Sequence, residues 1–233
     1  VNLVVVSTGF KAPTKARCLE SVREQLCGCY DTDSDTDRCY DTVKHVYVEA
    51  SEQSEPRPSK TENFYRAVHA LDPSDVVVCL DGDDWLAHER VLEKVRELHA
   101  AGAWLTYGSF RYADGRPGFA RAYPRSRPRG LPWLATHLKT FRAGLFQRIK
   151  EEDFKTTGGE WLFVTDMAMM LPMLEMAGPS RSVFCSDVLY VYNSATSNQE
   201  SGSYDDRIKE LEHARRIRLK TPYAELPADL RAP

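Results

Sequence analysis

Hydrophobic runs alternate with amphipathic segments along the first part of this 233-residue chain. Segments 2–10, 42–51 and 76–80 are short, rich in β-branched residues and bounded by small or polar residues, which is typical of buried strands. Between them, 15–26 and 61–71 carry apolar residues at helical spacing. This order of strands and helices predicts an α/β fold, in which a mostly parallel central sheet is flanked by helices.

The rest of the chain continues the alternation with longer segments. Apolar periodicity predicts a helix over 88–102, a strand over 103–112, helices over 133–149 and 164–178, a strand or strand pair over 183–193, and a helix over 204–220. Residues 113–132 are rich in Gly, Pro and Arg and predict an irregular region. Thr61 stands where an N-cap is expected for the helix over 61–71.

Three acids follow the third hydrophobic run directly, at Asp81, Asp83 and Asp84. Ligands bind outside the carboxyl ends of the strands in open parallel sheets, and the other two runs also end in small polar residues, 7–9 and 49–51. Asp-Gly alone is ordinary turn chemistry, but each buried charge after a strand is costly without a partner. The pattern therefore favours a ligand site or a site for Mg²⁺ or Mn²⁺, which prefer oxygen ligands.

A second acidic stretch, the loop over 31–37, competes with this site. Its acids alternate as in a calcium loop, but Thr36 and Thr42 occupy the positions that require Gly and Glu. We therefore expect a solvated surface insertion. Four cysteines surround this loop at a spacing that fits no usual zinc site, which leaves free thiols, a disulfide or a metal open for Cys18, Cys27, Cys29 and Cys39.

The composition argues against two classes of partner. Thirty-one basic and 34 acidic side chains give a net charge of −3, so no overall basic field indicates nucleic acid binding. No apolar run approaches the roughly 20 residues of a membrane-spanning helix. With no visible signal peptide, the sequence predicts a cytoplasmic protein without a transmembrane segment.

The segment "DVVVCLDGDDWLAHERVLEKV" resembles the DxD region of family 2 glycosyltransferases of the GT-A fold. The segments "VVVSTGFKAPTKARCLESVREQ", "VYVEAS", "TENFYRAVHALDPSDVVVCLDGDD" and "VTDMAMMLPMLEMAG" are similar to other parts of that family, in the same order. The resemblance implies a single GT-A-like domain over 1–220, with a nucleotide-sugar half over 1–112, an acceptor half over 113–220, and a tail over 221–233.

The resemblance also implies the activity and its residues. The protein would be an inverting, Mn²⁺- or Mg²⁺-dependent glycosyltransferase that moves a sugar from a UDP-sugar to a hydroxyl of a glycan or another acceptor. Asp166 would be the general base, although an Asp before an apolar run is also a good helix N-cap. Thr8 and Gly9 would contact the nucleotide, and Glu49 would contact the base or ribose. Asn63 corresponds to an Asn that is frequently seen in the family. Asp81 would contact the ribose and the metal, and Asp83 would be the main metal ligand.

Some positions stay open or depart from the family pattern. Asp84 is either a further metal ligand or a residue that orients the others. Many relatives carry a His after the last strand, where this chain has Asn193 and Asn198. Diphosphate or acceptor contacts would then come from one of two places. The first is the Arg-rich region, which is either a solvated surface or a flexible cover that orders over the substrate. The second is a set of three side chains of the predicted helix over 133–149, namely His137, Lys139 and Arg142. We expect Glu175 to support its helix rather than act as the base.

Two alternatives remain at this point. A sugar-phosphate nucleotidyltransferase would normally carry a Gly-rich basic loop after the first strand, whereas "STGFKAPTKAR" contains one Gly. A non-catalytic binding module with the same fold would bind its ligand without turning over a nucleotide sugar.

Overall fold

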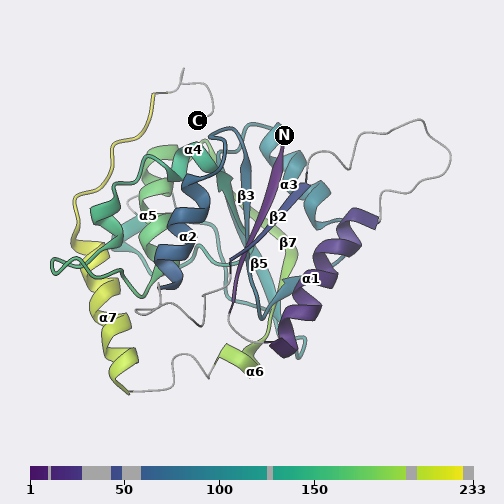
Figure 1. Ribbon diagram of the computed structural model, residues 1–233. Helices are drawn as coiled ribbons and strands as arrows, with labels where there is room; N and C mark the ends of the chain where they lie inside the picture. Colours follow the sequence, from purple (N-terminus) through teal and green to yellow (C-terminus); the bar gives the residue numbers. More distant parts are fainter. Residues whose placement is uncertain (10–11, 28–42, 49–58, 125–127, 198–203, 228–233) are drawn as a thin grey trace.

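The computed structural model describes residues 1–9, 12–27, 43–48, 59–124, 128–197 and 204–227 (Figure 1). The helices and strands alternate along much of the chain, as the hydrophobic pattern predicts. The strands are β1 (Leu3–Thr8), β2 (Val43–Val48), β3 (Val76–Asp81), β4 (Trp85–Leu86), β5 (Leu105–Tyr112), β6 (Lys139–Arg142) and β7 (Ser182–Tyr192). The helices are α1 (Ala12–Cys27), α2 (Lys60–His69), α3 (Val91–Ala100), α4 (Ala143–Phe146), α5 (Thr165–Ala177), α6 (Ser194–Ser197) and α7 (Tyr204–Leu219), with 3-10 turns η2 (Pro128–Gly130) and η3 (Glu151–Phe154).

The described strands form one seven-stranded sheet in the order β2-β1-β3-β6-β5-β7-β4. Strands β1, β2 and β3 are parallel, and so are β5 and β7. Strand β6 lies antiparallel between β3 and β5, and β4 pairs antiparallel with β7 at the edge. The predicted α/β class is confirmed, with a mixed sheet in which β6 joins two parallel blocks.

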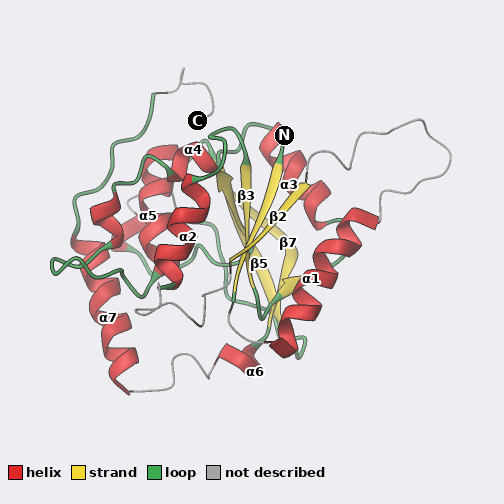
Figure 2. Cartoon of the chain, in the orientation of Figure 1, coloured by secondary structure: helices red, strands yellow, loops and turns green. Residues whose placement is uncertain are grey.

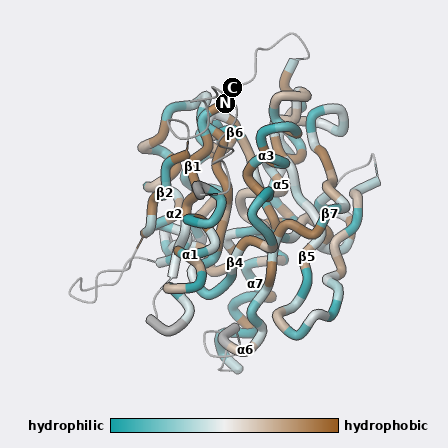
Figure 3. The backbone as a smooth tube through the Cα atoms, turned by 90° about the vertical axis from the view of Figure 1, so that its right-hand side faces the viewer, coloured by the Kyte–Doolittle hydropathy of each residue, from teal (hydrophilic) through white to brown (hydrophobic). Residues whose placement is uncertain are grey.

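Helices cover both faces of the sheet, and the strand sequences explain how. In β1, Val4 and Val6 pack in one core cluster while Leu3 and Val5 pack in the other, because successive strand side chains point to opposite faces. Helices α2, α4, α5 and α7 lie on one side, and α1 and α3 lie on the other (Figure 2). Figure 3 shows β1 as a hydrophobic segment of the backbone. Burial of each such side chain contributes about 1.5–3 kcal/mol, so both layers hold the sheet in place.

The predicted helix over 133–149 is wrong, because β6 and the short helix α4 occupy most of this segment. Leu138 packs in the cluster of α1 and α3, whereas Phe141 packs in the cluster of α2 and α5. Two side chains three residues apart share one face of a helix but point to opposite faces of a strand. Because the segment pairs with β3 and β5, it forms a strand despite the helical spacing of its apolar residues.

Helix capping also differs from the sequence expectation at two positions. Ser59, not Thr61, caps α2, and its hydroxyl accepts a hydrogen bond of 3.0 Å from the backbone N–H of Glu62. Helix α5 begins after Val164, which places Asp166 inside the first turn rather than at the cap. Thr61 and Asp166 are consequently available for contacts outside their own helices.

The end of the described chain lies against the domain. The hydroxyl of Tyr223 donates a hydrogen bond of 2.5 Å to Asp153, and the backbone N–H of Leu226 donates one of 2.8 Å to the carbonyl of Met176. Residues 221–227 therefore pack next to η3 and α5. None of the described helices has the length and apolar character needed to cross a membrane.

Candidate functional site

The carboxyl ends of β1 and β3 approach each other closely at two glycines. Thr8 is opposite Asp81 in the parallel register, and the N–H of Gly82 donates a hydrogen bond of 2.8 Å to the carbonyl of Thr8. A Cβ at Gly82 would lie 2.8 Å from the Tyr47 hydroxyl and 3.1 Å from the Cα of Gly9. Neither glycine has a positive φ, so the reason for glycine at both positions is close backbone packing. The predicted nucleotide contacts Thr8 and Gly9 thus lie beside the acidic turn.

Asp84 is the buried member of the three acids, with a side chain that faces β7. It accepts hydrogen bonds from the Tyr190 hydroxyl at 2.5 Å and from the backbone N–H of Asn193 at 2.7 Å. Burial, followed by the charge of Asp81, raises the pKa of Asp84 to about 8. Both carboxylate oxygens are engaged with the protein, so Asp84 fixes the acidic turn against β7.

Asp81 forms an ion pair with Lys60, the first residue of α2, at 2.7 Å. Burial raises the pKa of Asp81, but the ammonium groups of Lys60 and Lys139 outweigh this effect and hold the pKa below its ordinary value. Lys60 is a pocket residue that the sequence patterns did not indicate. A cation in the first turn of a helix opposes the helix dipole, and this local disadvantage is the signal that could have identified it.

Asp83 is half-buried in the same turn as Asp81. Its charge is among those that, after burial, raise the pKa of Tyr47 in β2 and of Cys18 in α1. Asp81 lines the pocket described below, whereas Asp83 is not among the residues that line it. Asp81 is therefore the carboxylate of the DxD sequence that lines the pocket.

Asp166 reaches the site from the first turn of α5 and forms an ion pair with Lys139 at the start of β6. Lys139 is 2% exposed, and Asp166 is 39% exposed. Burial raises the pKa of Asp166, but the ammonium group of Lys139 outweighs it, and the pKa lies below its ordinary value. The Asp166 carboxylate is therefore ionised at neutral pH and still partly accessible.

Two threonines join the helices that carry Lys60 and Asp166. The hydroxyls of Thr61 in α2 and Thr165 in α5 are 2.6 Å apart, and Thr61 also donates a hydrogen bond of 2.5 Å to the carbonyl of Leu162. Both threonines are buried. This contact holds the first turns of α2 and α5 next to each other, so the two charged side chains reach the same pocket.

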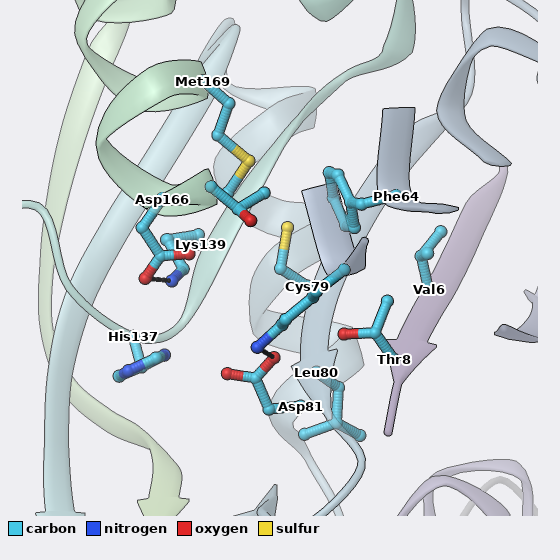
Figure 4. A pocket seen from close by; sticks show the side chains of 12 residues that line it. Val6, Thr8, Phe64, Cys79, Leu80, Asp81, His137, Lys139, Asp166 and Met169 are labelled. Carbon is cyan, nitrogen blue, oxygen red and sulfur yellow. Dashed lines mark hydrogen bonds and ion pairs between the residues drawn. The ribbon is translucent and has the colours of Figure 1, made fainter. Parts of the chain in front are cut away.

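One small pocket collects these groups, as Figure 4 shows. His137, Lys139 and Asp166 are drawn on one side of it, with Asp81 and Thr8 on the other. The His137 ring stacks on Tyr190 with a centroid distance of 4.4 Å. Burial, and then the positive charge of Lys139, lower the pKa of His137 to about 3. His137 is therefore neutral at physiological pH and offers hydrogen bonds rather than charge.

Several predicted site residues lie elsewhere. Arg142 is paired with Val76 at the amino end of β3, whereas Lys139 is paired with Cys79 near its carboxyl end. Three residues of strand separate the Cα atoms of Lys139 and Arg142 by roughly 10 Å. Arg142 is therefore outside the pocket. Asn63 is half-buried in α2, one turn after Lys60, and is not a pocket-lining residue. Glu49, the acidic loop 31–37 and cysteines 29 and 39 are outside the described residues, as is the side chain of Cys27.

The Arg-rich region divides into exposed and buried members. Arg111, Arg116 and Arg121 are exposed, whereas Arg129 is 8% exposed and forms two hydrogen bonds with Glu175, at 2.6 and 2.9 Å. Arg129 thus connects η2 to α5 and supports the fold. Glu175 supports its helix, as predicted. The described parts of the chain place Cys18, Cys79 and Cys185 as buried free thiols.

The acidic turn offers oxygen ligands for a divalent ion. Within the described ranges, no three His, Cys, Asp or Glu side chains converge on a single point. Asp84 is a supporting residue, so Asp81 and Asp83 are the carboxylates of the turn that could bind the ion. One or two carboxylates are the usual protein contribution to a Mg²⁺ site, and phosphate and water complete it. The residues therefore fit an ion that binds together with a diphosphate.

Comparison with known proteins gives matches in structure only. No protein-family model and no curated protein sequence matches the chain. The structure of S. aureus TarS 1–349 in complex with UDP-GlcNAc is similar, with a TM-score of 0.57 and 14% identity over 93% of this chain and 65% of that one. The chain thus spans less than two thirds of TarS 1–349.

Two further solved structures show the same relationship. Mannosyltransferase PcManGT from Pyrobaculum calidifontis, in complex with GDP-Man and Mn²⁺, has a TM-score of 0.57 and 17% identity over 95% of this chain and 66% of that one. Glucosyl-3-phosphoglycerate synthase from Mycobacterium tuberculosis, in complex with Mg²⁺ and UDP, has a TM-score of 0.55 and 14% identity over 92% of this chain and 79% of that one. From this likeness, the protein has a GT-A-like fold.

Proposed function

We propose that the protein is an inverting glycosyltransferase that uses Mn²⁺ or Mg²⁺. Its donor would be a nucleoside diphosphate sugar, a UDP-sugar by preference, and its acceptor a hydroxyl of a glycan or a similar compound. One observation carries the proposal: Asp81 at the end of β3 and the ionised Asp166 of α5 line one pocket, although 85 positions separate them in sequence. The similar structures, which hold UDP-GlcNAc, UDP or GDP-Man, support the donor class.

The donor half of the reaction uses the strand ends. Thr8 and Gly9 line the nucleotide, Asp81 contacts the ribose, and Asp83 with Asp81 would hold the divalent ion. When bound, this ion neutralises the charge that develops on the departing diphosphate. Glu49 and Asn63 remain proposed contacts to the nucleotide.

Two lysines at the pocket have different roles, and one of them supplies the cation that a His after the last strand would otherwise provide. Lys60 is 41% exposed at the pocket, so its ammonium group can turn from Asp81 towards a diphosphate oxygen. Lys139 is buried and stays paired with Asp166. We assign Lys60 to the leaving group and Lys139 to the orientation of the base. Neutral His137 contributes a hydrogen bond to either substrate.

The acceptor half depends on Asp166. Its carboxylate takes the proton of the acceptor hydroxyl while that oxygen bonds to the anomeric carbon and the diphosphate leaves. Such a group contributes about 10²–10⁴-fold to the rate. Attack on the face opposite the leaving group inverts the anomeric centre. The Lys139 ion pair keeps Asp166 ionised and restricts its rotation, which favours one orientation of the base.

A thermal-shift panel of nucleotide sugars, with and without Mn²⁺, tests the donor class first. We expect a donor-specific stabilisation that requires the ion and is lost in Asp83→Asn. Asp166→Asn should retain this shift and lose transfer by about 10²-fold or more. Asp187→Asn, at an exposed position, is the matched control. Pyrophosphate release would identify a nucleotidyltransferase instead, and donor binding without any turnover would identify a binding module.

A further inference from the structure

Helix α7 lies at the periphery of the domain and packs against it through one narrow face (Figure 1). Ile217 is the buried residue of this helix, and His213 and Ala214 are half-buried. The Arg218 guanidinium donates hydrogen bonds of 2.6 and 2.7 Å to the carbonyls of Arg129 and Leu131. These contacts fix the orientation of α7, and with it the face that points outward.

The outward face of α7 carries four exposed apolar side chains. Tyr204, Ile208, Leu211 and Leu219 are 79%, 37%, 67% and 76% exposed. Their intervals of four, three and eight residues place them in a single stripe along a helix with 3.6 residues per turn, with Arg215 in the same stripe. Ile217 is on the opposite side. A peripheral helix normally presents polar residues to solvent, so this stripe is unusual and indicates a contact surface.

The charges along α7 differ between its two ends. The helix begins with Asp205 and Asp206, and its last turns carry Arg215, Arg216 and Arg218. Acids at the start and cations at the end stabilise the helix itself. On one flank of the stripe, the residues Asp205, Lys209, Glu212 and Arg216 follow one another with alternating charge. This pattern is complementary to a copy of itself in the reverse direction.

We propose that two copies of the protein associate through an antiparallel pairing of α7. The stripe then meets its own copy, with Leu211 near the two-fold axis, as a self-complementary interface requires. On one flank, Asp205 faces Arg216 of the partner subunit, and Lys209 faces Glu212 of the partner subunit. A parallel arrangement would remove this alternation, because the flank that carries Asp205 would then face the other flank of the partner helix.

The size of the helix sets the strength of the dimer. Sixteen residues extend over about 24 Å, and the contact is small beside the roughly 800 Å² per subunit of a standard stable interface. The dimer should therefore dissociate on dilution in the micromolar range. This inference is independent of the proposed glycosyl transfer, since it concerns a surface on another part of the domain.

Sedimentation velocity of the full chain across about 1–100 µM tests the proposal. We expect a concentration-dependent shift from monomer to dimer mass, at least tenfold weaker in Leu211→Glu. Phe119→Glu, at a 55% exposed position outside α7, is the matched control and should leave the dimer unchanged. Circular dichroism of each variant reports whether the fold is intact.

A charge exchange tests the direction of the pairing. Asp205→Arg and Arg216→Asp should each weaken the dimer, and the double variant should restore it. Monomers at every concentration, or a dimer that Leu211→Glu leaves intact, would overturn the proposal. So would loss of folding in Leu211→Glu, because the stripe would then be covered by a segment of its own chain. If the double variant does not restore the dimer, the antiparallel arrangement is excluded.

Discussion

The hydroxyl of Tyr190 in β7 lies 2.5 Å from the Asp84 carboxylate in the turn after β3. The same hydroxyl accepts a hydrogen bond of 3.3 Å from the backbone N–H of Asp81. One fully buried side chain thus joins two of the three acids to a strand that lies 106 positions away from Asp84. The geometry of the acidic turn depends on this contact.

Tyr190→Phe removes the hydroxyl and leaves a buried carboxyl without its donor. We expect the free energy of unfolding to fall by about 1–3 kcal/mol, as measured by urea denaturation. Donor affinity should also decrease, because the turn that holds Asp81 is less restrained. Tyr112→Phe is the control, since the structure gives its hydroxyl no hydrogen bond to a described residue. Equal stability of the two variants would contradict the role of Tyr190.

Gly82→Ala places a methyl group 2.8 Å from the Tyr47 hydroxyl, with backbone atoms of Gly9 and Thr8 at 3.1 Å. Backbone cannot withdraw as a flexible side chain does, so we expect a loss of about 1–3 kcal/mol in stability. Donor-dependent thermal stabilisation should weaken as well. Gly130→Ala is a matched control, because a Cβ there has no heavy atom within 4 Å. Similar behaviour of the two variants would rule out close packing as the reason for Gly82.

Lys139→Met tests the ion pair of the proposed base. Without the ammonium group, the pKa of Asp166 rises, and the carboxylate is protonated at a higher pH. The acid limb of the pH–rate profile should therefore move to higher pH, along with a lower rate. Lys94→Met removes a more exposed cation paired with Asp187 and should leave the profile unchanged. An acid limb that stays in place would refute the coupling of Lys139 to Asp166.

Arg129→Met leaves Glu175 buried without its cation, since both side chains are 7% exposed. The expected loss is about 3–5 kcal/mol in the free energy of unfolding. The double variant Arg129→Met/Glu175→Leu should lose less than the sum of the two single variants, because no unpaired charge remains. Strict additivity in this double-mutant cycle would mean that the two groups do not interact.

His99 links stability to pH. It is 1% exposed, its ring nitrogen lies 2.7 Å from the Thr140 hydroxyl, and burial lowers its pKa to about 4 from an ordinary 6.5. Between these pH values the unfolded chain binds a proton that the folded protein does not, so stability falls as pH decreases, by up to about 1.4 kcal/mol per pH unit.

His99→Gln should therefore lose less stability than the unmodified protein between about pH 7 and pH 5. Urea denaturation at several pH values measures this difference. His88→Gln, at an exposed position, should retain the full dependence. If the free energy of unfolding changes with pH by the same slope in His99→Gln and in the unmodified protein, the pH dependence belongs to other groups.

Much of the fold follows from local patterns. The uninterrupted apolar run from Leu3 to Val6 is visible in the sequence, and burial on both faces of the sheet requires it. Helix α5, strand β7 and the position of three acids after β3 also agree with the predictions. These features depend on periods of 2 and 3.6 residues and on turn chemistry, which a short stretch of chain specifies.

The division of roles within the site depends on tertiary contacts. The three acids are alike in sequence, yet Asp84 is buried against β7 while Asp81 meets Lys60. Lys139 reaches the pocket and Arg142 does not, because β6 runs antiparallel between β3 and β5. Leu138 and Phe141 have a spacing that suits either a helix or a strand, and only insertion into the sheet decides between them.

The sequence by itself determined the α/β class and the edge of the sheet where the acids gather. The tertiary structure decided which charges are paired, and thus which carboxylates are ionised at neutral pH. The physical reason is that periodic burial is a local property, whereas the free energy of a buried charge depends on neighbours that are distant in sequence. Lys60, Lys139 and Asp166 act on one pocket only after the chain has folded around it.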